Sequence, residues 1–196
     1  MDFILASKNA HKLREMAAIL KPFGIRLRLQ SELDMDIDVE ETGTSFEENA
    51  MLKAEAVMRA SGLPAIADDS GLEVDALSGA PGIYSARYGG PQCINDAQRY
   101  EFLLENMRGI PEAERTARFV CVIAAAWPEG KRICVRGTCE GVILEQPGGE
   151  GGFGYDPVFY VPEEGCTFSE MPAERKNEIS HRANALRLFQ TKLTEG

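Results

Sequence analysis

Hydrophobic and polar positions alternate along the chain in patterns that predict strands and helices in turn. Residues 3–6 form a short apolar run, which is typical of a buried strand. Apolar residues then recur at helical spacing as far as Leu20, and Pro22 and Gly24 mark the end of that helix. Apolar and basic residues alternate over residues 25–30, so this segment is predicted to be a half-exposed strand.

The next helix and strand carry clearer boundary signals. Residues 44–48 contain two hydroxyl side chains that precede two glutamates, and this capping-box pattern predicts a helix that extends to about Ala60. Residues 65–67 are apolar and predict a buried strand. That strand is expected to end on two adjacent carboxylates, Asp68 and Asp69.

The second half of the chain begins with a predicted helix near residues 95–107. Two long strands, residues 116–127 and 131–145, are joined by a short turn, and their length predicts a hairpin that projects from the main sheet as a second lobe. A strand at residues 158–160 and a last helix from about Ser180 follow. Strands and helices that alternate in this way indicate an α/β fold.

The composition is that of a globular protein with one sizeable core. Hydrophobic residues make up 44% of the 196 residues and charged residues 27%, which is ordinary for such a protein. No apolar run approaches the roughly 20 residues of a membrane span, and the N-terminal segment lacks the pattern of a signal peptide. We expect no membrane partner and, without linkers or repeats, a single domain with a cleft over residues 1–196.

The net charge limits the classes of binding partner that fit this sequence, and the cysteine content indicates the cellular compartment. The formal net charge of −10 argues against a nucleic-acid partner, because such binding depends on lysines and arginines that neutralise phosphates. A small phosphorylated ligand is compatible with this charge, since a local group of cations or a metal can hold it. The five cysteines are odd in number and form no C-x-x-C pair. We therefore expect reduced thiols in a cytoplasmic protein, with neither a disulfide framework nor a zinc site.

Asp68 and Asp69 are the most informative charges in the sequence. Adjacent carboxylates raise each other's proton affinity unless a cation neutralises them. Mg²⁺ prefers carboxylate oxygens and completes its coordination with waters and substrate phosphates, so the pair predicts Mg²⁺ as a cofactor. Glu40 or Glu41, in the acidic segment at residues 34–42, would supply a further ligand. Taken by themselves, these glutamates are better explained as a solvated acidic loop.

A candidate phosphate site lies where the first strand meets the first helix. Free backbone N–H groups and the positive end of the helix dipole favour an anion at such a junction. Side chains there would add hydrogen bonds and a positive charge. The alternative is an ordinary helix cap followed by solvated charges, which is the more common arrangement. The residues concerned are Ser7, Lys8, Asn9, Ala10, His11 and Lys12.

Two later segments also have a functional and a plain interpretation. Residues 148–154 (GGEGGFG) lack the Lys-Ser/Thr ending of a Walker P-loop, yet their glycines would let the backbone approach a ring or a phosphate closely. A flexible connection explains them about as well. Lys176, His181 and Arg182 place cationic donors at the start of the last helix. A lone histidine is more often a structural hydrogen-bonding group than a catalyst.

Seven short motifs follow one another along nearly the whole chain, from Ser7 to about Leu193. They are S-x-N-x-x-K, EETG, SFEENA, ADDSGL, GAPGIYSAR, GGFGYDP and SHR. In this order they closely resemble the inosine/xanthosine triphosphate pyrophosphatase family, enzymes that remove deaminated purine nucleotides. Position 7 is serine where many members carry threonine, which keeps the hydroxyl group.

The resemblance implies a fold and a reaction. The fold is a mixed, elongated central sheet flanked by helices, with two lobes around a deep nucleotide-binding cleft, in a homodimer. The reaction is the Mg²⁺-dependent hydrolysis of ITP, dITP, XTP and dXTP to the monophosphate and pyrophosphate.

The resemblance also implies residue roles. Asp69 would accept a proton from the attacking water, and Asp69 and Glu40 would bind Mg²⁺, with Glu41 and Asp68 as alternative ligands. The phosphates would be bound by residues 7–12. Independently of the resemblance, Lys53 could help to neutralise the charge that develops on the phosphate oxygens. The resemblance places His181 and Arg182 in the nucleotide site, and on chemical grounds N–H donors from His181, Arg182 or nearby backbone would satisfy the C6 oxygen of the base. The remaining nucleotide-site residues would be Ser70, Phe153, Gly154, Tyr155, Asp156 and Lys176.

Three other functions are distinguishable from this one. A related pyrophosphatase for modified pyrimidine nucleotides would need a different base pocket, and FGYDP with SHR favours purines. A nucleotide-binding regulator would show no turnover. An aspartyl-phosphate hydrolase built on Asp68 and Asp69 would form a phosphoenzyme and release phosphate, not pyrophosphate.

Overall fold

The computed structural model describes residues 1–7 and 9–195, and it consists of two compact units. Unit 1 comprises Met1–Asp69, Cys121–Gly137 and Asn177–Gly196. Unit 2 comprises Ser70–Val120 and Thr138–Lys176. Each unit is described by itself below, and the single domain expected over residues 1–196 stays a prediction.

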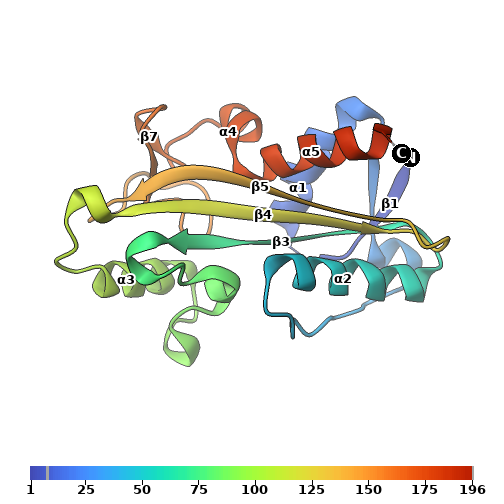
Figure 1. Cartoon of the computed structure of the whole chain (residues 1–196), viewed down its shortest axis with the longest axis horizontal. Coiled ribbons are helices and arrows are strands. Elements are labelled where there is room, and N and C mark those ends of the chain that lie inside the picture. Colours follow the sequence, from blue (N-terminus) through green and yellow to red (C-terminus); the bar gives the residue numbers. More distant parts are fainter. Residues whose placement is uncertain (8, 196) are drawn as a thin grey trace. The chain divides into compact units, whose positions relative to one another are not determined.

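Seven strands of the described residues form one sheet in the order β2-β1-β3-β4-β5-β6-β7 (Figure 1). β1 pairs in parallel with β2 and β3, whereas the β5–β6 and β6–β7 pairs are antiparallel. The strands are β1 (Asp2–Leu5), β2 (Arg26–Leu29), β3 (Ala65–Val74), β4 (Thr116–Ala126), β5 (Arg132–Ile143), β6 (Phe159–Val161) and β7 (Cys166–Thr167). The sheet is therefore mixed, and helices flank it, which confirms the predicted α/β class.

The structure corrects the predicted end of the third strand. β3 does not end at Asp68 and Asp69 but continues through Val74, so both carboxylates lie in the middle of the strand. Ser70 and Gly71 belong to the strand as well, although their residue types are typical of a turn. Asp68 and Asp69 are buried, and the cations that permit this are distant in sequence, so no local signal showed that the strand would continue.

The predicted projecting hairpin is also wrong. β4 and β5 have nearly the predicted boundaries, but β4 is hydrogen-bonded to β3 and β5 to β6 within the same sheet. Residues 119–126 of β4 are all apolar and buried, as a central strand requires. The two strands are therefore part of the main sheet and do not project from it.

The helices of the described residues are α1 (Ala10–Leu20), α2 (Phe46–Ser61), α3 (Asp96–Asn106), α4 (Ala173–Ile179) and α5 (His181–Glu195). The predicted cap of α2 is confirmed for Ser45, which accepts a hydrogen bond from the Glu48 backbone at 3.2 Å, whereas Glu48 accepts one at 2.6 Å from the backbone of Thr44, the residue before the cap. Two short elements, α4 and β7, were not predicted. None of these helices combines the length and apolar character that a bilayer crossing requires.

The core of unit 1 lies between its strands and the helices α1 and α5. These two helices lie on one side of the strands and α2 on the other (Figure 1). Phe3 packs edge-on against Trp127 and Phe189, with ring centroids 5.3 and 5.8 Å apart. Buried aliphatic side chains from α1 and β4 complete this core, which fixes α5 and the residues at its start.

Gly137 on β5 allows the start of α5 to approach the sheet closely. A Cβ atom at this position would overlap the Ala185 backbone nitrogen and lie 2.6 Å from the His181 carbonyl oxygen. We expect Gly137→Ala to lower the free energy of unfolding by about 1–3 kcal/mol, as overpacking does. Thermal unfolding measures this, with Cys134→Ala at an exposed position of the same strand as the control. An unchanged melting temperature would contradict the close approach.

Unit 2 has an aromatic core of its own. Phe119, Phe159 and Phe168 pack against one another, with ring centroids 4.6 to 5.6 Å apart. Arg115 is also buried, and its guanidinium group donates to backbone carbonyls, including those of Ile143 at 2.7 Å and Leu144 at 2.9 Å. The arginine therefore satisfies carbonyl groups that would otherwise be buried without donors. All five cysteines of the chain are free thiols.

Candidate active site

The start of α1 is capped by the side chains that the sequence suggested. Asn9 Oδ1 accepts a hydrogen bond from the Lys12 backbone at 3.2 Å, and Ser7 Oγ accepts one from the Asn9 backbone at 3.2 Å. The capping interpretation of this segment is therefore confirmed for Asn9. The predicted contribution of Lys8 lies outside the described residues, as do the side chains of Ala10 and His11.

Lys12 is not a solvated charge. Its Nζ atom lies 3.0 Å from Oδ2 of Asp68, and Nη2 of Arg182 lies 3.3 Å from the same oxygen. Nη1 of Arg182 also binds Glu15 on α1. One buried carboxylate oxygen therefore meets two cations from two different helices.

These cations explain how Asp68 remains charged in the interior. Burial by itself would raise the pKa of the Asp68 carboxyl group. The positive charges of Lys12, Arg182 and Lys53 outweigh burial and hold this pKa well below its usual range. Asp68 is thus engaged with basic side chains through its Oδ2 atom, and its role as a metal ligand stays a prediction.

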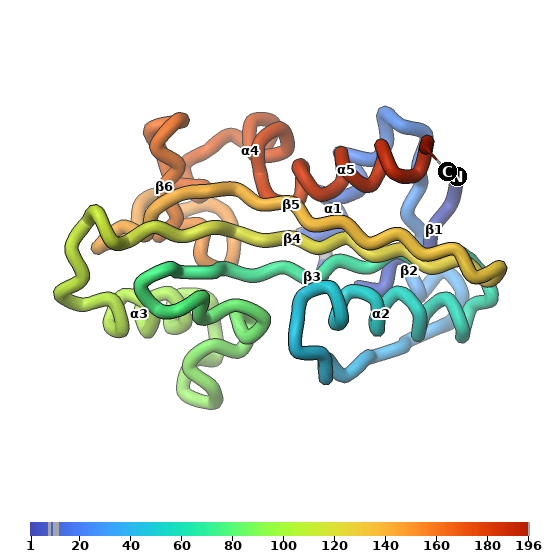
Figure 2. The backbone as a smooth tube through the Cα atoms, viewed as in Figure 1, coloured from blue at the N-terminus to red at the C-terminus, as the bar shows by residue number. Residues whose placement is uncertain are grey.

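Asp69 has a different environment. Lys53 on α2 donates to Asp69 Oδ1 at 2.8 Å and to Glu41 Oε1 at 2.7 Å, so one ammonium group joins the two carboxylates. The acidic segment that contains Glu41 runs back along α2 (Figure 2), which places this glutamate beside the lysine. Glu40, the other candidate ligand, is exposed, so the geometry favours Glu41.

The second oxygen of Asp69 is the atom most suited to chemistry. Asp69 Oδ2 is buried and accepts no hydrogen bond from the residues that the structure describes. Burial raises the pKa of Asp69, Lys53 opposes this shift, and the nearby Glu41 adds to it, so the net direction is upward. A carboxylate with a raised pKa and an unshared oxygen is suited to accept a proton from water or to bind a cation.

We call these seven residues of unit 1 the ionic cluster. They are Lys12, Glu15, Glu41, Lys53, Asp68, Asp69 and Arg182. Three cations and four carboxylates give it a formal net charge of −1. Within the described part of the chain, no three His, Cys, Asp or Glu side chains converge as a complete metal site. Glu41 and Asp69 nevertheless fit Mg²⁺, which takes one or two carboxylates and completes its shell with phosphates and waters.

A second group of candidate residues lies in unit 2. Lys176 Nζ donates to Asp156 Oδ2 at 2.7 Å and lies 4.9 and 5.3 Å from the ring centroids of Phe153 and Phe168. Asp156 Oδ2 also accepts a hydrogen bond from the Phe153 backbone at 2.9 Å. We call these four residues the lysine–aromatic cluster. It combines buried charge, a hydrogen-bonding edge and aromatic faces.

The glycine-rich loop before this cluster is held by side chains from other segments. Gly154 donates its backbone N–H to Asp96 on α3 at 2.8 Å, and the Gly151 carbonyl accepts a hydrogen bond from Ser169 at 2.6 Å. Gly152 has φ of 78°, and a Cβ atom there would lie 2.7 Å from Asp156 Cβ. The glycine lets the loop turn directly over the Asp156 side chain.

Other predicted site residues have plainly structural contacts. Tyr155 is buried and donates its hydroxyl hydrogen to the Ser85 carbonyl at 2.7 Å, and burial raises the pKa of this phenol. This bond joins the GFGYDP and GIYSAR motifs. Ser70 is part-buried in β3. His181 is buried as the first residue of α5, directly after Ser180, whose Oγ accepts a hydrogen bond from the Ala183 backbone at 3.2 Å.

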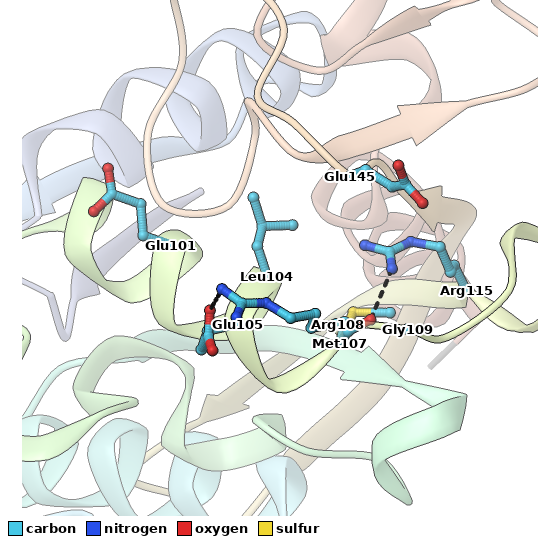
Figure 3. Close-up of a pocket in the computed structure, with 8 residues that line it drawn as sticks. All are labelled: Glu101, Leu104, Glu105, Met107, Arg108, Gly109, Arg115 and Glu145. Carbon is cyan, nitrogen blue, oxygen red and sulfur yellow. Dashed lines mark hydrogen bonds and ion pairs between the residues drawn. The ribbon is translucent and has the colours of Figure 1, made fainter.

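Unit 2 contains a cavity of about 360 Å³ (Figure 3), and no residue of the lysine–aromatic cluster lines it. Its cationic side chains are engaged, because Arg108 pairs with Glu105 and Arg115 donates to backbone carbonyls. Three glutamates in its lining would repel a triphosphate. The lining residues are Glu101, Leu104, Glu105, Met107, Arg108, Gly109, Arg115 and Glu145.

Sequence reasoning missed three residues that support these clusters. Glu15 follows Lys12 by three positions, a spacing that places both on one face of a helix and so could have suggested a link. Asp96 and Phe168 carried no comparable signal, because their partners are distant in sequence.

Comparisons with known proteins cover the whole chain. The model of the Ham1 family matches residues 3–192. A dITP/XTP pyrophosphatase of Geobacillus kaustophilus is 51% identical over 194 residues, which cover 99% of this chain and 93% of that protein. A dITP/XTP pyrophosphatase of Thermus thermophilus is 51% identical over 196 residues, which cover 100% of this chain and 93% of that protein.

Solved structures agree with the sequence relatives. The structure of a HAM1 protein from Coxiella burnetii has a TM-score of 0.90 and 42% identity, with complete coverage of both chains. That of the Staphylococcus aureus Ham1 protein has a TM-score of 0.88 and 44% identity, over 100% of this chain and 99% of that chain. The resemblance seen in the ordered motifs is thereby confirmed: the chain belongs to the Ham1 family.

Proposed function

We propose that this protein hydrolyses the non-canonical purine nucleoside triphosphates ITP, dITP, XTP and dXTP to the monophosphate and pyrophosphate. The observation that carries the proposal is Asp69, whose Oδ1 is bound by Lys53 while its buried Oδ2 accepts no hydrogen bond within the described part of the chain. Relatives aligned over nearly their full length are named dITP/XTP pyrophosphatases, which supports this choice of substrates.

Mg²⁺ is the proposed cofactor, held by Glu41 and Asp69. Bound there, it would neutralise phosphate charge and lower the pKa of a coordinated water. The fit rests on the net negative charge of the ionic cluster and on the Asp69 oxygen described above. Glu41 replaces Glu40 as the preferred ligand because Glu41 shares a cation with Asp69, whereas Glu40 is exposed.

The reaction needs one proton acceptor and several donors to phosphate. Asp69 Oδ2 takes a proton from water, whose oxygen forms a bond to the α-phosphorus while the bond from that phosphorus to the bridging oxygen breaks. Pyrophosphate leaves with the electron pair of the broken bond, and Asp69 returns its proton to solvent. Lys12 and the N–H groups at the start of α1 bind the negative oxygens.

The lysine–aromatic cluster is the proposed base-binding element. The Phe153 ring offers a stacking face, and the Lys176 ammonium group is an N–H donor, as the C6 oxygen of hypoxanthine and xanthine requires. Adenine carries an amino donor at that position, and an unsatisfied buried donor costs about 1–3 kcal/mol. His181 is proposed as a further donor. Arg182 is bound by two carboxylates, so we assign it a different role below.

A substrate panel tests the proposal. ITP, XTP, dITP, ATP, GTP and dUTP are incubated with the protein and Mg²⁺, and products are separated to distinguish pyrophosphate from phosphate. We expect inosine and xanthosine nucleotides to give pyrophosphate at rates well above those of ATP and GTP. Preferred turnover of dUTP would support the pyrimidine-directed alternative, and no turnover of any nucleotide would support a binding regulator.

Two further properties are proposed, the first from the family resemblance and the second from the cysteine usage. The protein forms a homodimer, which light scattering coupled to gel filtration tests directly. It is located in the cytoplasm, in keeping with its free thiols. Fractionation of the source cells tests that location.

Lys53 provides a test of the metal site. Lys53→Met removes the cation between Glu41 and Asp69, so without Mg²⁺ we expect the free energy of unfolding to fall by about 3 kcal/mol. Mg²⁺ should then restore more stability to the variant than it adds to the parent protein, because binding stabilises the folded state. Thermal unfolding with and without Mg²⁺ measures this, with Lys192→Met in the exposed Lys192–Glu195 pair as control. An equal Mg²⁺ response in variant and parent would argue against metal binding at these carboxylates.

A further inference from the structure

Arg182 is buried to a degree that is unusual for a charged side chain. Only 1% of it is exposed, and its guanidinium group binds Glu15 on α1 and Asp68 on β3. Burying such a group with two carboxylates costs more free energy than burying apolar side chains of similar size. Packing of α5 against α1 therefore does not by itself explain a charged side chain at this position.

Asp68 connects the buried arginine to Lys12. The same Asp68 oxygen lies 3.3 Å from Arg182 Nη2 and 3.0 Å from Lys12 Nζ. Lys12 and Glu15 are three residues apart on α1, and therefore lie on one face of that helix. The contacts form a closed path from Glu15 to Arg182, Asp68 and Lys12, and back along one turn of α1.

We propose that Glu15 is a positioning residue that acts through Arg182 and Asp68 to hold the Lys12 ammonium group in place for substrate phosphates. The inference rests on the proposed function, because it takes Lys12 to bind a polyphosphate. A lysine side chain loses rotamer freedom when it binds a ligand. If the fixed Asp68 carboxylate already holds the Lys12 side chain in place, less conformational entropy is lost when Lys12 binds a phosphate.

The charge of Glu15 determines how strongly the Asp68 carboxylate binds Arg182 and how strongly it binds Lys12. With Glu15 ionised, Arg182 is balanced by two carboxylates, and Asp68 is left to bind Lys12 as well. Without that charge, the positive charge of Arg182 is no longer balanced by Glu15. The net attraction of this pair for Asp68 and its net repulsion of Lys12 therefore both increase. Glu15→Gln keeps the shape of the side chain and removes only the charge, so it isolates this effect.

A double-mutant cycle between Glu15→Gln and Lys12→Ala tests the inference. Two quantities are measured for the full-length protein: the affinity for inorganic tripolyphosphate by calorimetry, and kcat/KM for ITP. We expect Glu15→Gln to lower both by about tenfold when Lys12 is present and by less than about twofold when Lys12 is absent. Glu15→Asp should recover part of the loss.

Glu55→Gln is the matched control, because Glu55 is similarly part-buried and binds an arginine, Arg132, outside the ionic cluster. It should leave both quantities unchanged. An equal effect of Glu15→Gln in both backgrounds, or a loss explained by a lower melting temperature alone, would overturn the positioning role. If Lys12→Ala itself changes neither quantity, the proposed phosphate role of Lys12 fails, and the inference fails with it.

Discussion

Asp69→Asn is expected to lower kcat by about 10²–10⁴-fold while nucleotide binding remains largely intact. The amide keeps the shape of the side chain but cannot accept a proton as a carboxylate does. Burial already favours a high pKa for this group, so the parent side chain is suited to the proton transfer that the variant loses. Single-turnover measurements with ITP, combined with calorimetric binding of the nucleotide, separate these two effects.

Asp75→Asn is the control for Asp69→Asn. Asp75 also binds a basic side chain, Arg118 at 3.0 Å, but it belongs to neither cluster. Its variant should retain the kcat of the parent. Near-normal turnover by folded Asp69→Asn would remove Asp69 from the mechanism.

Lys12→Ala is expected to lower kcat/KM for ITP by about 10- to 100-fold. A hydrogen bond to a charged group contributes about 1.5–3 kcal/mol, and the lysine would meet the phosphates in both the bound substrate and the transition state. KM should therefore rise, and kcat should fall only to the extent that the lysine binds the transition state more strongly than the substrate. Steady-state kinetics with ITP, at saturating Mg²⁺, measure both constants.

Lys12 also contacts the buried Asp68, so its removal should affect stability as well as catalysis. Lys12→Ala keeps the Asn9 cap of the helix but removes a counter-charge of Asp68, so we expect the melting temperature to fall together with kcat/KM. A fall in stability with unaltered kinetics would mean that Lys12 serves the fold and not the phosphates.

Local patterns predicted most elements of the fold. The capping box placed α2 to within a few residues, because its hydrogen bonds connect neighbours in sequence. β3 was predicted too short because Ser70 and Gly71 are typical of turns, whereas the strand in fact continues past two buried aspartates. β4 lies beside β3 because residues distant in sequence pair with each other. The spacing of hydrophobic residues along the chain does not predict such pairing.

In the candidate site, too, the sequence identified individual residues but not the contacts between residues that are far apart in the chain. The ordered motifs pointed to Lys12 and Asp69, a charge argument added Lys53, and the structure joins Lys53 to Asp69. The preference for Glu41 over Glu40 required the position of Lys53 in space. Likewise, the two carboxylates that bind Arg182 lie on other elements, so its buried ionic contacts were not predicted, and its expected role as a donor to the base stays a prediction.

Hydrolysis of ITP in water enriched with oxygen-18 tests the central claim most directly. The account places the attacking water on the α-phosphorus, with Asp69 as its proton acceptor. Mass spectrometry should therefore find one heavy oxygen in the IMP product and none in pyrophosphate. Label in pyrophosphate, or release of labelled phosphate in place of pyrophosphate, would contradict the account.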